Sequence, residues 1–487
     1  VDEQDPWHVI GGMQDTGHWL GPGRVYDEEG ITDEDWDKLR YTGDGMASAT
    51  DPRDPNIVYL VQQFGNTSRM DLRDWERVEL QPTAEELAAL GIDGPVRYNW
   101  TPAFLLSRHD PDYVYLGSNH LFRIHGKTGD VQRISDDLTW QQDRTFLGIR
   151  DGYHSYGTLF SVAESRFDRD VLWAGADDGP IHVTRDGGAS WTEVGANIPD
   201  APAHCVVAEI ETSRFVRERG YVALDCHARD DHEPYLYRTE DLGRTWTSVV
   251  GDLADGPAYV IREDPDDPDV LYVGVEHGVQ ASVDGGRHWA RLGSGLPTAG
   301  VRSLALQARD RDLVAGTFGR AIWTVDIGPM AEMAEALGEL LHVFPVETAT
   351  RFRWRVTYGN TIEELNGDEM FRAETPPVGT PIRYALAAGG APASIVIRNA
   401  AGAVVRTLSG PGDPGVHAVW WDLRSDATAE AEYGRGAGAT PSEWAYRQLV
   451  AVGSYRVTVS AGERERTVTV AVRDEPVYGV RQAPLRR

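Results

Sequence analysis

The sequence lacks any apolar run close to the roughly 20 residues that a membrane-spanning helix needs. It is also poor in basic residues, because 47 Lys and Arg stand against 76 Asp and Glu and give a formal net charge of −29. Such a chain repels nucleic acid and anionic membranes unless a local basic patch intervenes. We therefore expect neither a membrane span nor a nucleic acid partner.

Several catalytic motifs are absent as well. There is no Gly-x-Ser-x-Gly elbow, no phosphate-binding loop and no His-Glu-x-x-His helix. These absences argue against the enzyme classes that depend on such motifs.

Cysteine is scarce, since the chain holds only Cys205 and Cys226. Each lies in an expected strand, 203–210 or 221–226, and the two strands would be antiparallel neighbours. Directly opposed residues bring their Cα atoms to about 4.5–5.5 Å, which suits a disulfide. Two buried free thiols are the alternative, and the sequence leaves both open.

Glycine, proline and tryptophan are plentiful, with 52, 27 and 15 residues in a chain of 487. With 41% apolar and 25% charged residues, this composition is typical of a turn-rich, all-β globular protein. A chain of this length is too long for one ordinary core, so we expect a large repeat domain and a smaller second domain.

A repeated unit supports the first of these domains. It consists of an apolar strand, a Pro/Asp turn, a second strand ending in Gly, a polar loop and a third strand. The turns are 51–56, 109–112, 167–170 and 264–269, and the strands that follow them are 57–61, 113–117, 171–175 and 270–274.

The third strands of three units run into one motif, Ser/Thr-x-Asp-x-Gly-x-x-Trp, at 184–191, 239–246 and 282–289. The Asp can accept hydrogen bonds from backbone N–H groups of its own turn, and the Gly permits a positive φ. The Trp can pack beneath the turn and bury a large apolar surface. We assign a structural role in these Asp boxes to Asp186, Trp191, Asp241, Trp246, Asp284 and Trp289.

Radial repetition of such sheets is the signature of a β-propeller, and we count about seven blades within residues 1–329. Residues 1–6 resemble the turn that elsewhere follows the innermost strand. We therefore expect the first blade to lack its innermost strand, which an N-terminal propeller segment or a partner chain would complete.

The pattern changes beyond Pro329. We predict a helical linker and connector over 330–374, then an immunoglobulin-like β-sandwich over 375–475 from its period-2 alternation, and a tail over 476–487. The predicted fold class is thus all-β, a propeller with Asp-box repeats followed by a sandwich.

These residues resemble bacterial sortilin-type or BNR-repeat (Asp-box) propeller proteins, which are often described as glycosyl-hydrolase-like. The segment 11–17 is similar to a blade segment of that group, and 43–45 and 316–323 fit it too. Segments 396–408 and 420–424 resemble the immunoglobulin-like module of the flagellar hook-cap type. The resemblance implies export, hence an extracellular or periplasmic protein.

The resemblance leaves the activity open, because Asp boxes identify a scaffold and not a site. A sialidase is disfavoured, since its Arg-Ile-Pro signature is absent. Chemistry is expected on the loops between second and third strands and on the connections between blades, at the face opposite the Asp boxes. Candidate catalytic carboxylates there are Asp15, Asp44, Asp177, Asp178, Asp231 and Glu276. Candidate ligand-binding residues are Trp100, Tyr153, His154, Tyr156, His227, His277 and Arg320.

Two functions follow from these residues. The first is a binding or scaffold module for a polypeptide or glycan. The second is a glycoside hydrolase, in which two carboxylates act as acid and base about 5–9.5 Å apart while aromatic rings stack on sugars. We expect no resident cofactor, although His and carboxylates near Asp230 and His232 are suitable ligands for a divalent cation.

Overall fold

The structure is a computed structural model that describes residues 1–25, 30–39, 43–141, 156–254, 256–293, 295–352, 372–374, 377, 379–429 and 446–475. The described chain divides into two compact units. The first contains Val1–Gly21 and Asp37–Ile327, and the second contains Pro22–Trp36 and the described residues between Gly328 and Glu475. No helix among the described residues is long and apolar enough to cross a membrane.

The described part of the first unit contains seven sheets, numbered here in chain order, and five of them are four-stranded and antiparallel. Sheets 1 to 3 consist of β1 (His8–Met13), β2 (Gly17–Pro22) and β4 (Asp37–Lys38); β5 (Gly45–Asp51), β6 (Asp54–Gln62), β7 (Thr67–Asp71) and β8 (Arg77–Glu79); and β9 (Phe104–Leu106), β10 (Tyr113–Gly117), β11 (Leu121–His125) and β12 (Val131–Arg133). Sheets 4 and 5 consist of β13 (Leu159–Glu164), β14 (Leu172–Ala176), β15 (Ile181–Thr184) and β16 (Thr192–Glu193); and β17 (Val206–Thr212), β18 (Gly220–Asp225), β19 (Tyr235–Thr239) and β20 (Thr247–Ser248). Sheets 6 and 7 consist of β21 (Ala258–Glu263), β22 (Leu271–Val275), β23 (Gly278–Ser282) and β24 (Ala290–Arg291); and β25 (Val301–Gln307), β26 (Asp312–Thr317) and β27 (Ile322–Asp326).

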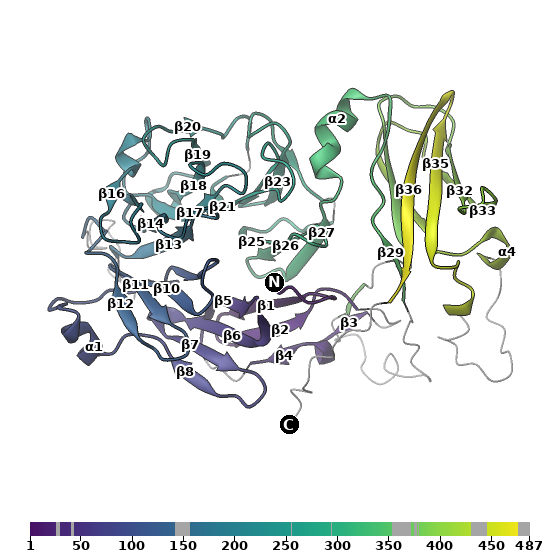
Figure 1. The fold of residues 1–487 in the computed structure, drawn as a ribbon. Coiled ribbons are helices and arrows are strands. Elements are labelled where there is room, and N and C mark those ends of the chain that lie inside the picture. The colour runs from purple at the N-terminus through teal and green to yellow at the C-terminus, as the bar shows by residue number, and fades with distance from the viewer. Residues whose placement is uncertain are drawn as a thin grey trace. The chain divides into compact units, whose positions relative to one another are not determined.

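The sheets follow one another around a common centre, so the first unit is a β-propeller (Figure 1). The first strand of a sheet lies against the first strand of the next, as where Ser161 Oγ of β13 donates to the Val207 carbonyl of β17 at 2.9 Å. Contacts between the two ends of the unit close the circle. Trp7 Nε1 donates to Asp312 Oδ2 at 2.9 Å, and Gln307 Nε2 donates to the Asp2 carbonyl at 2.7 Å.

Glycines identify the place of β1 in its sheet. The second strands β14 and β22 carry Gly175 and Gly274, at which an added Cβ would collide with the first strand of the following sheet. An added Cβ at Gly12 of β1 would collide in the same way with Gly45, the first residue of β5. The strand β1 therefore corresponds to the second strand of the other sheets.

The three Asp boxes share one hydrogen-bond pattern. In the first, Asp186 Oδ1 accepts from Ser190 N at 2.9 Å, and Thr184 Oγ1 accepts from Gly188 N at 3.0 Å. In the second, Asp241 accepts from Thr245 N in the same way. Hydrogen bonds from Ser190 lower the pKa of Asp186 to about 2, so its carboxylate keeps the corner closed over a wide pH range.

The Asp-box tryptophans also join neighbouring sheets, a role that the sequence did not reveal. Each indole N–H donates to a carbonyl just beyond the fourth strand of the preceding sheet. The acceptors are Ile134 for Trp191 at 2.8 Å, Val194 for Trp246 at 3.1 Å and Val249 for Trp289 at 3.2 Å. Each corner therefore holds two sheets together besides closing its own hairpin.

The two cysteines are bonded to each other. Cys205 precedes β17 and Cys226 follows β18, and the two strands are antiparallel neighbours with Val206 opposite Asp225. Of the two alternatives left open by the sequence, the structure has the disulfide, with a Cα–Cα distance of 4.6 Å.

The second unit is a sandwich of two sheets that share one core, which includes Ile382 and Trp421 from one sheet and Ile395 and Val457 from the other. The smaller sheet consists of β28 (Leu341–Val343), β31 (Thr380–Leu386) and β34 (Gly415–Trp421). The larger sheet consists of β29 (Ala349–Arg351), β36 (Arg464–Asp474), β35 (Gly453–Ala461), β32 (Ala393–Arg398) and β33 (Val404–Gly410). A separate pair joins β3 (Ile31–Thr32) to β30 (Arg372–Ala373).

The helical segments of the described residues are short. They are η1 (Asp33–Asp35), η2 (Gln63–Gly65), α1 (Ala84–Ala89), η4 (Gly195–Asn197), η5 (His227–Arg229), η6 (Met330–Glu332), α2 (Met333–Gly338) and α4 (Asp426–Ala429).

The unit limits differ from those expected from the sequence. The predicted connector 330–374 includes β28 and β29, which pair with strands of the sandwich, and the second unit also takes in Pro22–Trp36. Local periodicity could not reveal this, because strands of three residues become recognisable only through their partners. The predicted tail 476–487 lies outside the described residues.

We expect Trp246→Ala to lower the free energy of unfolding of the propeller by about 3–5 kcal/mol, because the indole is buried, lies edge-on to Trp173 and holds Val194. Trp289→Ala is the matched control, since Trp289 makes the same bond but is only half-buried, and should cost clearly less. Urea denaturation followed by circular dichroism measures both. If both substitutions lowered the free energy of unfolding equally, burial of the indole ring would not be what makes Trp246 important.

Candidate functional site

The loops between second and third strands emerge at one end of each sheet, together with the connections from one sheet to the next. In an antiparallel four-stranded sheet this end is opposite the hairpin that holds the Asp box. We call it the loop face. Most of the residues singled out from the sequence lie in these loops.

Five side chains from sheets 5, 6 and 7 form the mouth cluster, which we define as Asp225, His227, Tyr259, Glu276 and Arg302. His227 Nδ1 lies 2.7 Å from both oxygens of Asp225. The Arg302 guanidinium lies 4.0 Å from the centre of the Tyr259 ring, and its Nη1 lies 3.9 Å from Asp225 Oδ2. Tyr259 Oη donates to Glu276 Oε2. The cluster is thus one continuous set of contacts across three sheets.

Electrostatics in the mouth cluster follow from these contacts. The hydrogen bond to Asp225 raises the pKa of His227, because the carboxylate stabilises the imidazolium. Burial and the hydrogen bond to Glu276 raise the pKa of Tyr259, so its hydroxyl remains a donor. The ring of Phe318, 5.5 Å from the Arg302 guanidinium, extends the cluster with an exposed apolar surface.

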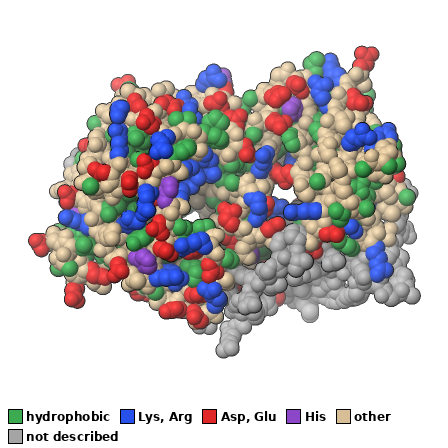
Figure 2. All heavy atoms as spheres, in the orientation of Figure 1, with side chains coloured by type: hydrophobic (Ala, Val, Ile, Leu, Met, Phe, Trp, Pro, Cys, Tyr) green, Lys and Arg blue, Asp and Glu red, His purple; other side chains and the backbone are tan. Residues whose placement is uncertain are grey.

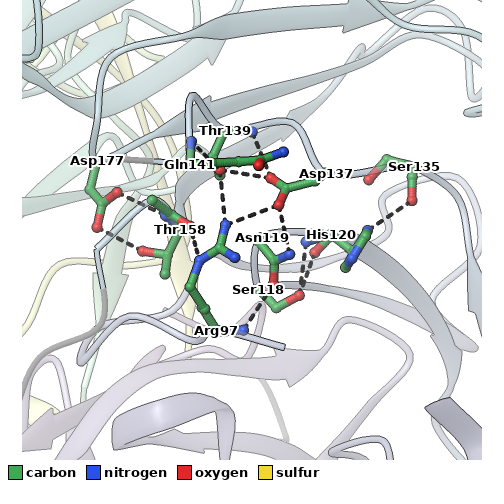
Figure 3. Close-up of polar contacts among 11 residues, drawn as sticks. Arg97, Ser118, Asn119, His120, Ser135, Asp137, Thr139, Gln141, Thr158 and Asp177 are labelled. Atoms are coloured by element: carbon green, nitrogen blue, oxygen red, sulfur yellow. Dashed lines mark hydrogen bonds and ion pairs between the residues drawn. The ribbon is translucent and has the colours of Figure 1, made fainter. Parts of the chain in front are cut away.

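A second polar network ties loops around sheet 3 (Figure 3). Arg97 Nη2 lies 3.0 Å from Asp137 Oδ2 and donates to Thr139 Oγ1 at 3.1 Å. Asn119 Nδ2 donates to the same Asp137 oxygen at 3.0 Å, and Arg97 N donates to Asn119 Oδ1 at 2.8 Å. These partners come from the connections before and after the sheet and from the loop within it, so the network fixes the shape of the loop face.

Asp177 belongs to the same layer of loops. Its Oδ1 accepts from Thr158 N at 2.8 Å, while Oδ2 accepts from Thr158 Oγ1 at 2.7 Å and from Asn99 Nδ2 at 2.9 Å. Burial raises the pKa of Asp177 to about 6. Asp178 beside it is fully buried. These are the surroundings of side chains that hold loops together, and a catalytic role for either stays a prediction.

The other predicted carboxylates differ in exposure. Asp15 is exposed, and its backbone N donates to Asp44 Oδ1 at 2.8 Å, so these two candidates are neighbours. Asp44 itself is buried. Asp231 accepts from Tyr235 Oη at 2.9 Å and is half-buried, as is Glu276. Solvent therefore reaches Asp15, Asp231 and Glu276 among the six.

The predicted ligand-binding residues are also dispersed. Trp100 is half-buried with its ring edge-on to Phe64 at 5.1 Å, and Tyr156 is buried. His227, His277 and Arg320 are exposed on the loop face. Tyr153 and His154 lie outside the described residues.

The residues expected to suit a divalent cation lie near each other at the surface. Asp230 and His232 are both exposed, with 3.7 Å between His232 Nε2 and Asp230 Oδ1, and cation binding there stays a proposal. In the second unit Glu335, Glu339 and His342 bring potential ligand atoms within 4.8 Å of one another.

Sequence reasoning missed three members of the mouth cluster: Asp225, Tyr259 and Arg302. All three lie in strands, whereas the residues expected from the sequence to carry chemistry lie in loops. Tyr259 and Arg302 are each the second residue of a first strand, and this shared position was the signal that could have found them.

The chain was compared with family models, curated proteins and solved structures. No protein-family model matches the chain, and no curated protein matches it either. A solved structure described as "YCF48 bound to D1 peptide" is similar over 66% of this chain and 82% of that chain, with 11% sequence identity and a TM-score of 0.39. A similarity of this size carries no argument about function.

Asp177 should make stability depend on pH. Its folded pKa of about 6 exceeds the ordinary value of 3.8, so the folded state holds the proton more tightly, and stability falls as pH rises from about 4 to 6. Each pH unit is worth about 1.4 kcal/mol, which gives a loss of order 3 kcal/mol. Chemical denaturation from pH 4 to 8 should show this fall in stability for the wild type. The fall should be smaller for Asp177→Asn, and for the exposed control Asp230→Asn it should be as large as for the wild type. Parallel profiles for all three proteins would contradict the assignment.

Proposed function

We propose that the propeller is a binding module whose ligand is an extended polypeptide segment. The observation that carries this proposal is a group of exposed apolar side chains next to the mouth cluster. Phe318, Ile322 and Trp323 are 76%, 39% and 38% exposed, although the third strands of the other sheets are largely buried. Exposed apolar groups of this kind mark interaction surfaces.

The edge between sheets 7 and 1 supports an extended ligand. Ser161 and Ser303 hold equivalent places, opposite Gly175 and Gly316 respectively. Ser161 is buried against Val207 of the next first strand, whereas Ser303 is exposed. An added Cβ at Gly316 would meet only Ser303 among the described residues. A strand added along β1 would cover these groups, as in other cases of β-augmentation.

The mouth cluster supplies polar anchors beside this edge. Arg302, between the rings of Tyr259 and Phe318, can bind carbonyl or carboxylate oxygens of a polypeptide. We propose that the added strand comes from an N-terminal propeller segment of a longer protein or from a partner chain.

Finer features of the scaffold belong to the same proposal. Seven described sheets support a seven-bladed ring, and three corners with one hydrogen-bond pattern support membership of the Asp-box, sortilin-like group. The two-sheet second unit supports an immunoglobulin-like domain. The disulfide supports an extracellular or periplasmic location, because such bonds persist in oxidising compartments. A glycoside hydrolase using Asp15, Asp231 or Glu276 is the alternative.

Strand binding can be tested with three fluorescent peptides that copy this chain's own first strands: 159–164, 206–212 and 258–263. We expect saturable binding to the wild type in fluorescence anisotropy. Gly316→Leu should weaken it about tenfold or more, since its side chain would occupy the space of the added strand. The control Gly295→Leu, at a glycine with nothing within 4 Å, should bind as the wild type does.

Absence of binding by all three peptides, or equal binding by both variants, would reject the strand proposal. A panel of plant and microbial polysaccharides tests the alternative, because a hydrolase releases reducing sugar whether or not the peptides bind.

A further inference from the structure

A Ser-Arg pair follows the first strand of three consecutive sheets: Ser107-Arg108 after β9, Ser165-Arg166 after β13 and Ser213-Arg214 after β17. Equivalent positions in adjacent sheets lie at the same end of the propeller, here the end opposite the loop face. The pairs therefore gather three guanidinium groups around the centre of the propeller, far from the mouth cluster along the strands.

Buried carboxylates hold the backbone of these pairs. Glu164 accepts from Ser107 Oγ at 2.9 Å, from Arg108 N at 2.6 Å and from Tyr115 Oη at 3.1 Å. Glu263 accepts in the same way from Ser213 Oγ, Arg214 N and Tyr221 Oη. Both carboxylates are buried. Their hydrogen bonds come from hydroxyl and backbone N–H donors, and Arg219 Nη1 lies 3.5 Å from Glu263 Oε1, so neither carboxylate pairs with the guanidinium group of Arg108 or Arg214.

A fourth guanidinium, that of Arg262 in β21, completes the group that we call the arginine cluster: Arg108, Arg166, Arg214 and Arg262. Glu209 Oε1 lies 2.8 Å from Arg262 Nη1, and Glu211 Oε1 lies 3.4 Å from Arg166 Nη2. Among the described residues, no hydrogen bond or ion pair of the Arg108 or Arg214 side chain is found, and the buried Nε of Arg166 and of Arg214 has no acceptor.

Two opposing charge effects act on the arginine cluster, repulsion among its guanidinium groups and attraction to the carboxylate of Glu211. Crowding around the propeller centre, and then the guanidinium group of Arg166, lower the pKa of Arg108, although its side chain remains exposed to solvent. Burial lowers the pKa values of Arg166 and Arg214, the Glu211 carboxylate opposes this change, and the neighbouring guanidinium groups add to it. The chain has a net charge of −29, so a group of four arginines around one centre runs against its overall charge. Figure 2 shows Lys and Arg side chains bordering the central hollow.

We propose that the arginine cluster is a binding site for a phosphate or sulfate group. Guanidinium groups match tetrahedral oxyanions through paired N–H donors, and Arg108 and Arg214 have donors to spare. A bound oxyanion would also accept from the buried Nε atoms of Arg166 and Arg214, and its charge would add to those of Glu209 and Glu211 in offsetting the four guanidinium groups. The site is independent of the proposed strand binding.

Isothermal titration of the full chain with inorganic phosphate, sulfate and phosphoserine tests this proposal. We expect saturable binding of at least one of them, and a rise of the thermal unfolding midpoint with its concentration. Arg108→Gln and Arg214→Gln should each weaken binding about tenfold or more. Arg464→Gln, an exposed arginine in the second unit, should leave it unchanged.

Stronger binding of phosphoserine than of phosphate would assign the site to a phosphate group on a larger molecule, and the reverse to the free ion. Arg108→Lys keeps the charge, so partial rescue by this variant separates anion binding from a folding defect, as does an unchanged circular dichroism spectrum. Absence of saturable binding by all three anions, or equal binding by the Arg108→Gln and Arg464→Gln variants, would overturn the proposal.

Discussion

The attachment of each sheet to its neighbour is the constraint on which the propeller depends. A single four-stranded sheet cannot bury both faces, so its stability comes from the sheets before and after it. The Asp-box tryptophans meet this need by combining apolar burial with a hydrogen bond to a carbonyl of the preceding sheet. Glycines in the second strands also attach neighbouring sheets, because the lack of a Cβ lets the first strand of the following sheet approach closely.

This arrangement separates the two ends of the propeller. One end holds the Asp-box corners and the Ser-Arg pairs, whose side chains repeat from sheet to sheet because they serve the repeated contact. The other end holds loops of unequal length, and there the side chains differ between sheets. The mouth cluster arises at this second end because three sheets each contribute a different residue to one set of contacts.

Buried charge is used in two contrasting ways. Asp177, Glu164 and Glu263 each accept several hydrogen bonds from uncharged donors, which stabilise a buried carboxylate and fix the loop that donates them. Arg108 and Arg214 are held only through their backbone and Ser neighbours, and their own donors lack a described acceptor. The carboxylates thus have their hydrogen-bond partners within the chain, whereas the two arginines have donors that an external anion can use.

The sequence by itself determined the all-β class and the propeller repeats, and it located the corners at 184–191, 239–246 and 282–289. The hydrogen bonds of the Asp and of the Ser/Thr hydroxyl stay within the motif, so this part of an Asp box can be recognised in one segment. The bond of the indole N–H goes to the preceding sheet and could not be predicted in this way. The neighbouring strands of Cys205 and Cys226 could likewise be predicted, because one hairpin joins them.

Only the tertiary structure decided which of the predicted site residues are buried and which of them contact one another. Asp177 and Glu276 look alike as acidic residues after a second strand, yet Asn99 and Thr158 enclose the first while Tyr259 binds the second near solvent. The short strands β28 and β29 depended on partners far along the chain. Such contacts join residues that are tens of positions apart, and their register is set by the packing of whole sheets, which no local pattern encodes.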